Sequence, residues 1–316
     1  MASERTPSTF QLKSLTMLSI IQALSLAALA TTVLANPLPR QTHHFKRTCS
    51  TGPDTSSSFL ANPAYSAAAN NAATPSGYIN TFTNLHASNN ADGYQGYTIL
   101  PAYDIASCAN SCTARPSCQA FNVFFERTPP SSNSYNSTCS TATIKCVFWS
   151  GGVNVANAVN TGSTQNGFEI VIAGSNGYIK SAIAASPGYG SSTYLGNNAI
   201  SAPNDCNGKN TYMGFQIFND APFNATRCAE ACSAQSAYNI AHPGSDGVKP
   251  LTCQFFNTYE TFKNGVNQGQ WCVLYSQSWG KGVATNTGYT YGKDVYTIGS
   301  SYAYANATDA GVCVKA

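Results

Sequence analysis

The chemistry open to this sequence depends first on its cysteines. There are 12 in 316 residues, and two pairs share the spacing Cys-x3-Cys, namely Cys108 with Cys112 and Cys228 with Cys232. On a helix this spacing puts both sulfurs on one face with Cβ atoms about 5–6 Å apart, whereas a disulfide needs about 3.8 Å. Each cysteine of a pair must therefore bond a different partner on whatever packs against that face, which we expect to be a β-sheet.

A metal site is the competing interpretation of Cys-x3-Cys. Beyond residue 47 the sequence has two histidines, His86 and His242, and neither stands near a matching cysteine. Many cysteines at repeated spacings in an exported chain favour disulfides. We therefore predict disulfides, with no metal and no cofactor.

The N-terminus has the features of an export signal. A basic residue precedes the uncharged segment 15–35, which is rich in Leu, Ile and Ala and ends in small residues. We assign residues 1–35 to a signal peptide and 36–47 to a propeptide that ends in a dibasic pair of the kind kexin-type proteases cleave. The mature chain would then begin at Thr48 and be released.

A signal anchor is the alternative, because about 20 apolar residues can span a bilayer. Several Ser and Thr residues lower the apolarity of this segment and favour cleavage. The last seven residues have no apolar tail, so we expect no lipid anchor and no membrane anchor in the mature chain.

Charge excludes one class of partner. Only 9% of the residues are charged, and the net charge of +3 comes from the first 47 residues, which hold five basic residues against one acidic residue. The rest has 11 basic and 12 acidic residues. A nucleic-acid-binding surface needs a basic stripe, so we expect no nucleic-acid partner.

An internal duplication organises the remainder of the chain. Four cysteines recur in the same order, and two of them begin similar pentapeptides. The first copy contains Cys108-x3-Cys112, Cys118-Gln-Ala-Phe-Asn122 and Cys146-Val-Phe-Trp-Ser150, and the second Cys228-x3-Cys232, Cys253-Gln-Phe-Phe-Asn257 and Cys272-Val-Leu-Tyr-Ser276. A second, looser repeat follows each last cysteine, Ala156-Asn-Ala-Val-Asn-Thr-Gly162 against Ala284-Thr-Asn-Thr-Gly288. Insertions at 127–145 and 237–251 distinguish the copies.

The pattern within each copy predicts one helix and several antiparallel strands, an α+β module. Helices are expected at 105–114, capped by Asp104, and from 225 to about 237, capped by Asn224. Segments rich in Phe, Val, Thr and Tyr predict strands at 118–125, 253–262 and 271–276, the last after a turn at Lys263-Asn264-Gly265.

These elements give two modules, at 48–175 and 193–316. Residues 50–93 are rich in Ser, Asn and Ala, and we expect mainly loop there. Residues 176–192 are rich in Gly and Ser and are expected to form a connector.

The helical Cys-x3-Cys, the strand beginning Cys-x-x-Phe-Asn and the later Cys-Val-Leu-Tyr strand together resemble PAN/apple modules. The tandem arrangement, with Asn264-Gly-Val-Asn-Gln-Gly269 before Trp271-Cys272, is similar to secreted fungal proteins that contain two such domains. The resemblance covers roughly residues 95–175 and 205–316.

The resemblance implies a disulfide pairing that counting alone cannot give. In that family the first helical cysteine pairs with the later strand, the second pairs with the earlier strand, and a further bridge joins the module ends. The implied pairs are Cys108–Cys146, Cys112–Cys118, Cys228–Cys272, Cys232–Cys253 and Cys206–Cys313. Cys49 and Cys139 are left, and we pair them by elimination.

Motifs of catalysis are sparse. The sequence has no Gly-x-Ser-x-Gly elbow, His-Glu-x-x-His helix or phosphate loop, and we expect a surface-loop position for His242. We predict no catalytic residue. A pair of carboxylates acting as in a glycosidase is the alternative, drawn from Asp104, Glu126, Glu169, Glu230 and Glu260.

Three Asn-x-Ser/Thr sequons predict glycosylation, at Asn136, Asn224 and Asn306. Because Asn224 is also the expected helix cap, a glycan on its amide would compete with capping.

Aromatic side chains are the binding candidates, since rings on a sheet can stack on sugars or anchor a protein partner. Packing between strands is the alternative role for the same rings. Tyr302 and Tyr304, like Tyr289 and Tyr291, are two residues apart and share a face. Trp149 and Tyr275 occupy matching places on the face opposite their cysteines, and Trp279 is the one we expect to be most exposed. The binding candidates are Tyr302, Tyr304, Trp279, Trp149 and Tyr275.

The sequence therefore predicts a secreted, non-catalytic binding protein whose partner is an extracellular protein or a polysaccharide of the cell wall. The expected location is extracellular, either free or associated with the cell wall. A structural glycoprotein of the cell wall or surface is the second class, favoured by the low charge and the Asn, Ser and Tyr content. A hydrolase is the third.

Overall fold

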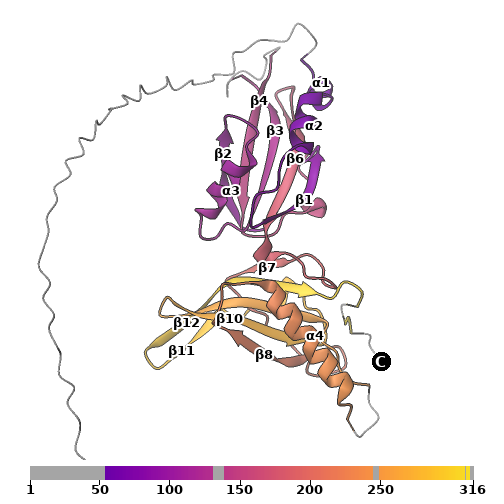
Figure 1. The fold of residues 1–316 in the computed structure, drawn as a ribbon, viewed down its shortest axis with the longest axis vertical. Coiled ribbons are helices and arrows are strands. Elements are labelled where there is room, and N and C mark those ends of the chain that lie inside the picture. The colour runs from indigo at the N-terminus through magenta and orange to yellow at the C-terminus, as the bar shows by residue number, and fades with distance from the viewer. Residues whose placement is uncertain (1–53, 131–138, 245–248, 310, 314–316) are drawn as a thin grey trace, which may run out of the picture. The chain divides into compact units, whose positions relative to one another are not determined.

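The computed structural model describes residues 54–130, 139–244, 249–309 and 311–313. The expected signal peptide and propeptide, Cys49 and the sequon at Asn136 lie outside these ranges. The described chain is α+β, with two antiparallel six-stranded sheets, each carrying its own helices (Figure 1).

The first sheet has the strand order β1-β6-β3-β4-β2, with β5 paired to β6. Its strands are β1 (Tyr78–Leu85), β2 (Tyr94–Leu100), β3 (Ala120–Thr128), β4 (Thr141–Trp149), β5 (Gly162–Gln165) and β6 (Phe168–Lys180). The helices of this module are α1 (Ser56–Leu60), α2 (Pro63–Asn70) and α3 (Ile105–Thr113), with a 3-10 turn η1 (Val155–Asn157).

The second sheet repeats this arrangement. Its strands are β7 (Thr193–Gly196), β8 (Tyr212–Phe218), β9 (Phe255–Lys263), β10 (Val266–Tyr275), β11 (Gly288–Tyr291) and β12 (Asp294–Ala305). The order β12-β9-β10-β8, with β7 and β11 both paired to β12, matches the first sheet strand for strand. The module has one long helix, α4 (Ala225–Ala241), and 3-10 turns η2 (Ser181–Ile183) and η3 (Lys281–Val283).

The helices begin where the sequence predicts, because each expected cap residue makes its bond. The Asp104 carboxylate accepts a hydrogen bond from the Ser107 amide at 3.0 Å, and Asn224 Oδ1 accepts one from the Thr226 amide at 3.0 Å. Helix α3 has the expected extent. Helix α4 continues four residues past the expected end, so part of the second insertion is helical.

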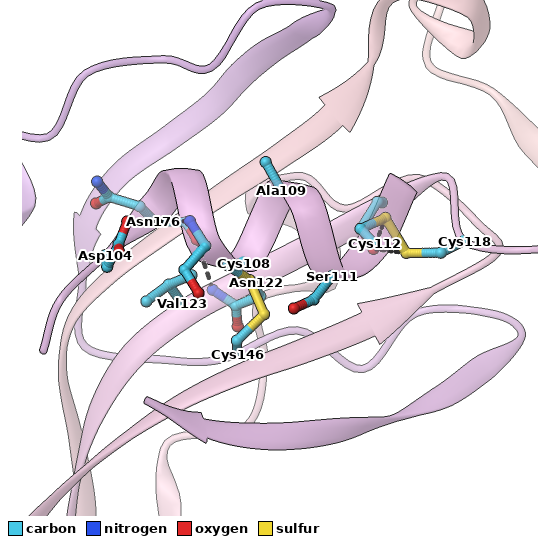
Figure 2. The surroundings of a disulfide bond; sticks show 12 residues. Asp104, Cys108, Ala109, Ser111, Cys112, Cys118, Asn122, Val123, Cys146 and Asn176 are labelled. Atoms are coloured by element: carbon cyan, nitrogen blue, oxygen red, sulfur yellow. Dashed lines mark hydrogen bonds between the residues drawn. A yellow bond between two sulfur atoms is a disulfide. The ribbon is translucent and has the colours of Figure 1, made fainter. Parts of the chain in front are cut away.

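Helices α3 and α4 are each joined to their own sheet by two disulfides. Figure 2 shows Cys108 and Cys112 on one side of α3, the first bonded to Cys146 of β4 and the second to Cys118, just before β3. All five pairings implied for the described cysteines are present, with Cα–Cα distances from 5.2 to 5.9 Å: Cys108–Cys146, Cys112–Cys118, Cys228–Cys272, Cys232–Cys253 and Cys206–Cys313. Cys139 is also disulfide-bonded, and Cys49, its expected partner, is outside the described ranges.

The asparagine that ends each Cys-Gln-x-Phe-Asn pentapeptide is fully buried and holds three parts of its module together. Asn257 Oδ1 accepts a hydrogen bond from the Ile200 amide, while its Nδ2 donates to Ser301 Oγ and to the Tyr302 carbonyl, all at 2.9–3.1 Å. Such buried polar groups require full pairing, and this one has it.

The first module contains the same network. Asn122 Oδ1 accepts a hydrogen bond from the Asn89 amide, and its Nδ2 donates to Ser175 Oγ. The same Nδ2 donates to the carbonyl of Asn176, which Figure 2 labels beside it. The looser repeat also has a structural role. The side chains of Asn160 and Asn286 each accept a hydrogen bond from the backbone amide of the glycine two residues later.

The expectation of mainly loop over residues 50–93 is wrong for α1, α2 and β1. The two helices are short and rich in Ser, Ala and Asn, and their stability depends on packing against β6 and β1. Thr55 and Asn62 cap them. Two asparagines, Asn80 and Asn84, conceal strand β1 in the sequence, although its Tyr78 and Phe82 are buried.

The expected connector at 176–192 is also wrong over its first part, because β6 continues to Lys180 and pairs there with Tyr78. The glycines that resemble a linker are required inside this strand. A Cβ on Gly177 would lie 2.2 Å from the Phe82 ring, and one on Gly174, where φ is +57°, would lie 2.8 Å from the Tyr65 carbonyl. Ile183 and Tyr189, further along, belong to the core of the second module.

The helix-facing sides of the sheets form the two main cores. The first includes Cys108, Phe121, Phe148 and Tyr178, and the second includes Cys228, Phe256, Leu274 and Tyr304 at matching positions. Within the described ranges, no helix is long and apolar enough to cross a membrane.

The paired asparagine networks give the first prediction. Asn122→Ala and Asn257→Ala should each lower the free energy of unfolding by about 2–3 kcal/mol, since each leaves a buried amide and a buried carbonyl without partners. Gln216→Ala, on exposed β8, is the control and should change it by less than about 0.5 kcal/mol. Urea titration of the oxidised protein measures all three, and similar stability of Asn257→Ala and Gln216→Ala would contradict the assigned role.

Candidate functional site

The helix-free side of the second sheet carries a set of partly exposed rings. Residues directly opposite each other on neighbouring strands share a face, and Trp271 pairs with Ile217 on one side and Tyr259 on the other. Cys272, one residue later, points to the helix. We call this side the aromatic face and define it by Phe215, Ile217, Tyr259, Trp271, Tyr289 and Tyr296.

The rings of the aromatic face stack across the strands. Phe215 and Trp271 lie 4.9 Å apart between centroids with planes 14° apart, and Trp271 and Tyr259 lie 6.2 Å apart with planes 11° apart. Tyr289 stacks on Tyr296 at 4.6 Å. Phe215 on the edge strand is 50% exposed and Tyr289 is 59% exposed, whereas Tyr259, on the inner strand β9, is buried.

The Tyr259 hydroxyl of this face remains protonated. Burial, followed by the nearby hydroxyls of Tyr212 and Tyr289, raises the pKa of Tyr259 to about 12. Burial also raises the pKa of Tyr275 strongly, with Tyr259 and Tyr212 as smaller contributors. The face therefore offers rings and hydroxyls, and its charged groups Lys263 and Asp294 neutralise each other in an ion pair beside the Tyr296 ring.

The corresponding face of the first sheet has different chemistry. Lys145 occupies the position of Trp271, and its Nζ lies 2.5 Å from the Glu126 carboxylate and 5.2 Å from the centre of the Tyr97 ring. Ser163 and Ile170 stand where the second module has Tyr289 and Tyr296. The first module thus has an ion pair at the position where the second has the stacked ring of Trp271.

Two of the expected binding residues, Tyr302 and Tyr304, are in the core instead. Each is 1% exposed. Tyr302 packs against Tyr194 and Phe223, and Tyr304 stacks on Phe256 at 4.8 Å and donates a hydrogen bond to the Ile183 carbonyl. Their role is packing, which corrects the prediction that they contact a ligand.

The other three expected positions are also covered. Trp149 and Tyr275 lie on the side opposite their cysteines, as predicted, but both are buried, and Tyr275 donates a hydrogen bond to the Ile200 carbonyl at 3.2 Å. Trp279 is partly buried in the same core and donates from Nε1 to Thr211 Oγ1 at 3.1 Å. Tyr275 packs in a cluster with Ile200 and Ala284, and Trp149 packs in another with Val153 and Ala91.

Sequence reasoning therefore missed Phe215, Ile217 and Trp271. A signal for them exists in the duplication itself. Once the cysteines align the copies, Trp271 stands opposite Lys145 and Tyr289 opposite Ser163, and such changes outside the shared motifs mark surfaces that are free to diverge.

The five candidate carboxylates have separate structural neighbours. Asp104 caps α3, Glu126 pairs with Lys145, Glu169 accepts a hydrogen bond from Ser56, Glu260 accepts one from Asn267, and Glu230 is exposed on α4. His242 ends α4 and stacks on Tyr238 at 4.3 Å. In the described part of the chain, no group of three or more His, Cys, Asp or Glu side chains could hold a metal ion.

The two described sequons have compatible geometry for glycosylation. Asn224 is exposed and caps α4 through Oδ1, whereas a glycan would attach at Nδ2. Capping and glycosylation therefore use different atoms. Asn306 Oδ1 accepts hydrogen bonds from the amide and hydroxyl of Thr308, the third residue of its sequon.

Comparisons of this chain with family models, with curated proteins and with solved structures give no match in any of the three. The fold and the site define a double α+β module whose helices are bonded to their sheets by disulfides.

The burial of Tyr304 gives the second prediction. Tyr304→Ala should lower the free energy of unfolding by about 3–5 kcal/mol, because it removes a core ring and leaves a cavity. Tyr291→Ala is the matched control, since Tyr291 is 76% exposed, and it should fold as the wild type does. Thermal and urea unfolding compare them, and equal stability would show that Tyr304 is not part of the core.

The capping geometry gives the third prediction. Asn224→Asp should remove a glycan from the secreted protein without loss of stability, because Asp caps as well as Asn. Asn224→Ala should remove the glycan and also lower the free energy of unfolding by about 1 kcal/mol. The mass of the peptide that contains Asn224, before and after peptide-N-glycosidase treatment, measures how much of this site carries a glycan. An unchanged mass for this peptide from the wild type would refute the predicted modification.

Proposed function

We propose that this chain is a secreted, non-catalytic binding protein built from two PAN/apple-like modules, and that the aromatic face of its second module binds a neutral polysaccharide. The proposal is supported by five disulfides, which form in oxidising compartments. The pairing implied by the resemblance to PAN/apple modules is also the pairing of the described cysteines.

One observation carries the binding assignment. The two modules share strand order, disulfides and buried asparagine network, yet differ on the helix-free face, where Lys145 and Glu126 of the first become Trp271 and Thr261 of the second. Since the scaffold does not require aromatic residues at these positions, their presence on an exposed surface supports a binding role.

The chemistry of the face favours carbohydrate. Phe215 stands at the edge strand with an exposed ring, and the apolar C–H face of a pyranose can pack on such a ring. Tyr212, on the same strand, and Tyr289, at the opposite edge of the sheet, are exposed and can hydrogen-bond sugar hydroxyls. The face lacks the cluster of cations that an acidic polymer would require, so a neutral glycan is the better match.

A structural role in a cell wall is the second candidate. It is favoured by the low charge of the chain and by the sequons at Asn224 and Asn306. The two candidates differ in reversibility, because a binding module is released from the wall by competing soluble polysaccharide and a structural component is not.

Binding measurements on matched variants form the fourth prediction. Phe215→Ala should weaken binding to an insoluble cell-wall glucan by at least about tenfold, because loss of one stacked ring at a hot spot removes about 1.4 kcal/mol or more. Tyr97→Ala, the equivalent position in the first module, should bind as the wild type does. Depletion isotherms at constant ionic strength provide the dissociation constants.

Thermal unfolding of both variants supplies the control for folding. Because each ring is half-exposed, its removal should change the stability little. Equal losses for Phe215→Ala and Tyr97→Ala, or no loss for either, would contradict the assignment to the second module. If the protein stays on the cell wall in detergent and soluble glucan does not release it, the structural candidate is favoured instead.

A further inference from the structure

A polar cavity of about 410 Å³ opens on the other side of the second sheet, between the β9–β10 hairpin and the segment that precedes α4. Its wall includes Asn219, Phe223, Glu260, Asn267, Gln268 and Gln270. This volume suits one sugar ring or a molecule of similar size. Glu260 and Gln270 lie directly opposite each other on β9 and β10.

The first module is filled at the same place. The residues that match Glu260, Gln270 and Phe223 are Phe125, Ile144 and Tyr103, as the aligned cysteines and strand pairs show. The Tyr103 ring stacks on Phe125 at 4.9 Å, and Tyr65 of α2 stacks on Phe125 at 4.3 Å. These rings form a continuous apolar core with α1 and α2.

The second module has lost this cover. Residues 181–192, which precede its first strand, contain one 3-10 turn in place of α1 and α2. The backbone shows the same difference. In the first module, Gly174 has no room for a side chain because the Tyr65 carbonyl lies against it. In the second module the matching residue is Ser300, with φ at 49°.

The floor of the cavity is polar and already paired. Thr258 is fully buried, where the first module has Val123, and Gln270 is 2% exposed. Gln270 Nε2 donates to Thr258 Oγ1 and to the Asn224 carbonyl, and its Oε1 accepts a hydrogen bond from the Asn224 amide. This network fixes the floor and leaves the remaining wall for a ligand.

That remaining wall mainly accepts hydrogen bonds. Glu260 Oε1 accepts a hydrogen bond from Asn267 Nδ2 at 2.7 Å, and both residues line the cavity. Gln268 directs its Nε2 to the Val266 carbonyl, so its Oε1 is the group left for a ligand. The one formal charge among the lining residues is the Glu260 carboxylate, and Phe223 supplies an aromatic ring.

We infer that this cavity binds a single sugar ring bearing a protonated amine. Such a ring donates hydrogen bonds from its hydroxyls to Gln268, pairs its ammonium with Glu260, and lays its apolar face against Phe223. The site lies on the opposite side of the sheet from the aromatic face and does not depend on ligand binding there.

The test uses isothermal titration of the full mature protein with D-glucosamine, N-acetylglucosamine and D-glucuronate. Glucosamine should bind with 1:1 stoichiometry, N-acetylglucosamine at least about tenfold more weakly because it lacks the ammonium, and glucuronate not measurably because its carboxylate would face Glu260. Glu260→Gln keeps the bond from Asn267 and should reduce glucosamine affinity at least about tenfold.

Two controls separate this site from others. Glu230→Gln removes an exposed carboxylate on α4 and should leave glucosamine binding unchanged, and Phe215→Ala should do the same although it weakens glucan binding. Gln268→Ala provides a second cavity variant if Glu260→Gln is unstable, and should weaken glucosamine binding. Absence of saturable glucosamine binding, equal affinity for glucuronate, or equal affinity of Glu260→Gln and the wild type would each overturn the inference.

Discussion

The architecture of both modules depends on one geometric constraint, which is that cysteines one turn apart on a helix cannot bond each other. Cys108 and Cys112 must both bond outwards, and so must Cys228 and Cys232. Two bonds from one helix face to two positions in or beside the sheet fix the position and rotation of the helix. Each bridge also constrains the unfolded chain, with a typical stabilisation of about 2–4 kcal/mol.

This stapling explains where the copies could diverge. The cysteine positions and the buried asparagines maintain the helix-facing core near α3 and α4, and these are the residues the two copies share. The helix-free face and the far end of the sheet lie outside that constraint. The first module uses this freedom for an ion pair and an apolar cover, and the second uses it for stacked rings and an open polar cavity.

The sequence predicted the elements that its own local chemistry defines. The caps at Asp104 and Asn224, the α+β class and the exclusion of a Cys108–Cys112 bond follow from side-chain geometry, while the specific pairing required the family resemblance. Helices α1 and α2 could not be predicted because, with five and eight residues, they are too short to be stable alone and depend on contact with β6. The continuation of β6 to Lys180 was hidden because glycines needed for close packing look like linker residues.

The candidate site was predicted least well, for a related reason. Period-two spacing shows that Tyr302 and Tyr304 share a face, but it does not show which face is covered, and α4 with Ile183 covers theirs. Burial of a strand residue is decided by segments far away in the sequence. The exposed positions, Phe215 and Trp271, become visible only when the two copies are compared position by position.

The polar floor of the cavity in the second module shows how buried polar residues can replace apolar ones while their side chains stay fixed in place. Replacing Val123 and Ile144 by Thr258 and Gln270 would be destabilising if these buried groups lacked partners. Instead, Gln270 bonds both the amide and the carbonyl of Asn224, the cap of α4, and so ties the start of that helix to β10. The hydrogen bonds thus replace the apolar contacts that α1 and α2 make in the first module. Because the disulfides Cys228–Cys272 and Cys232–Cys253 hold the next two turns of α4, the side chains around the cavity are positioned before any ligand arrives.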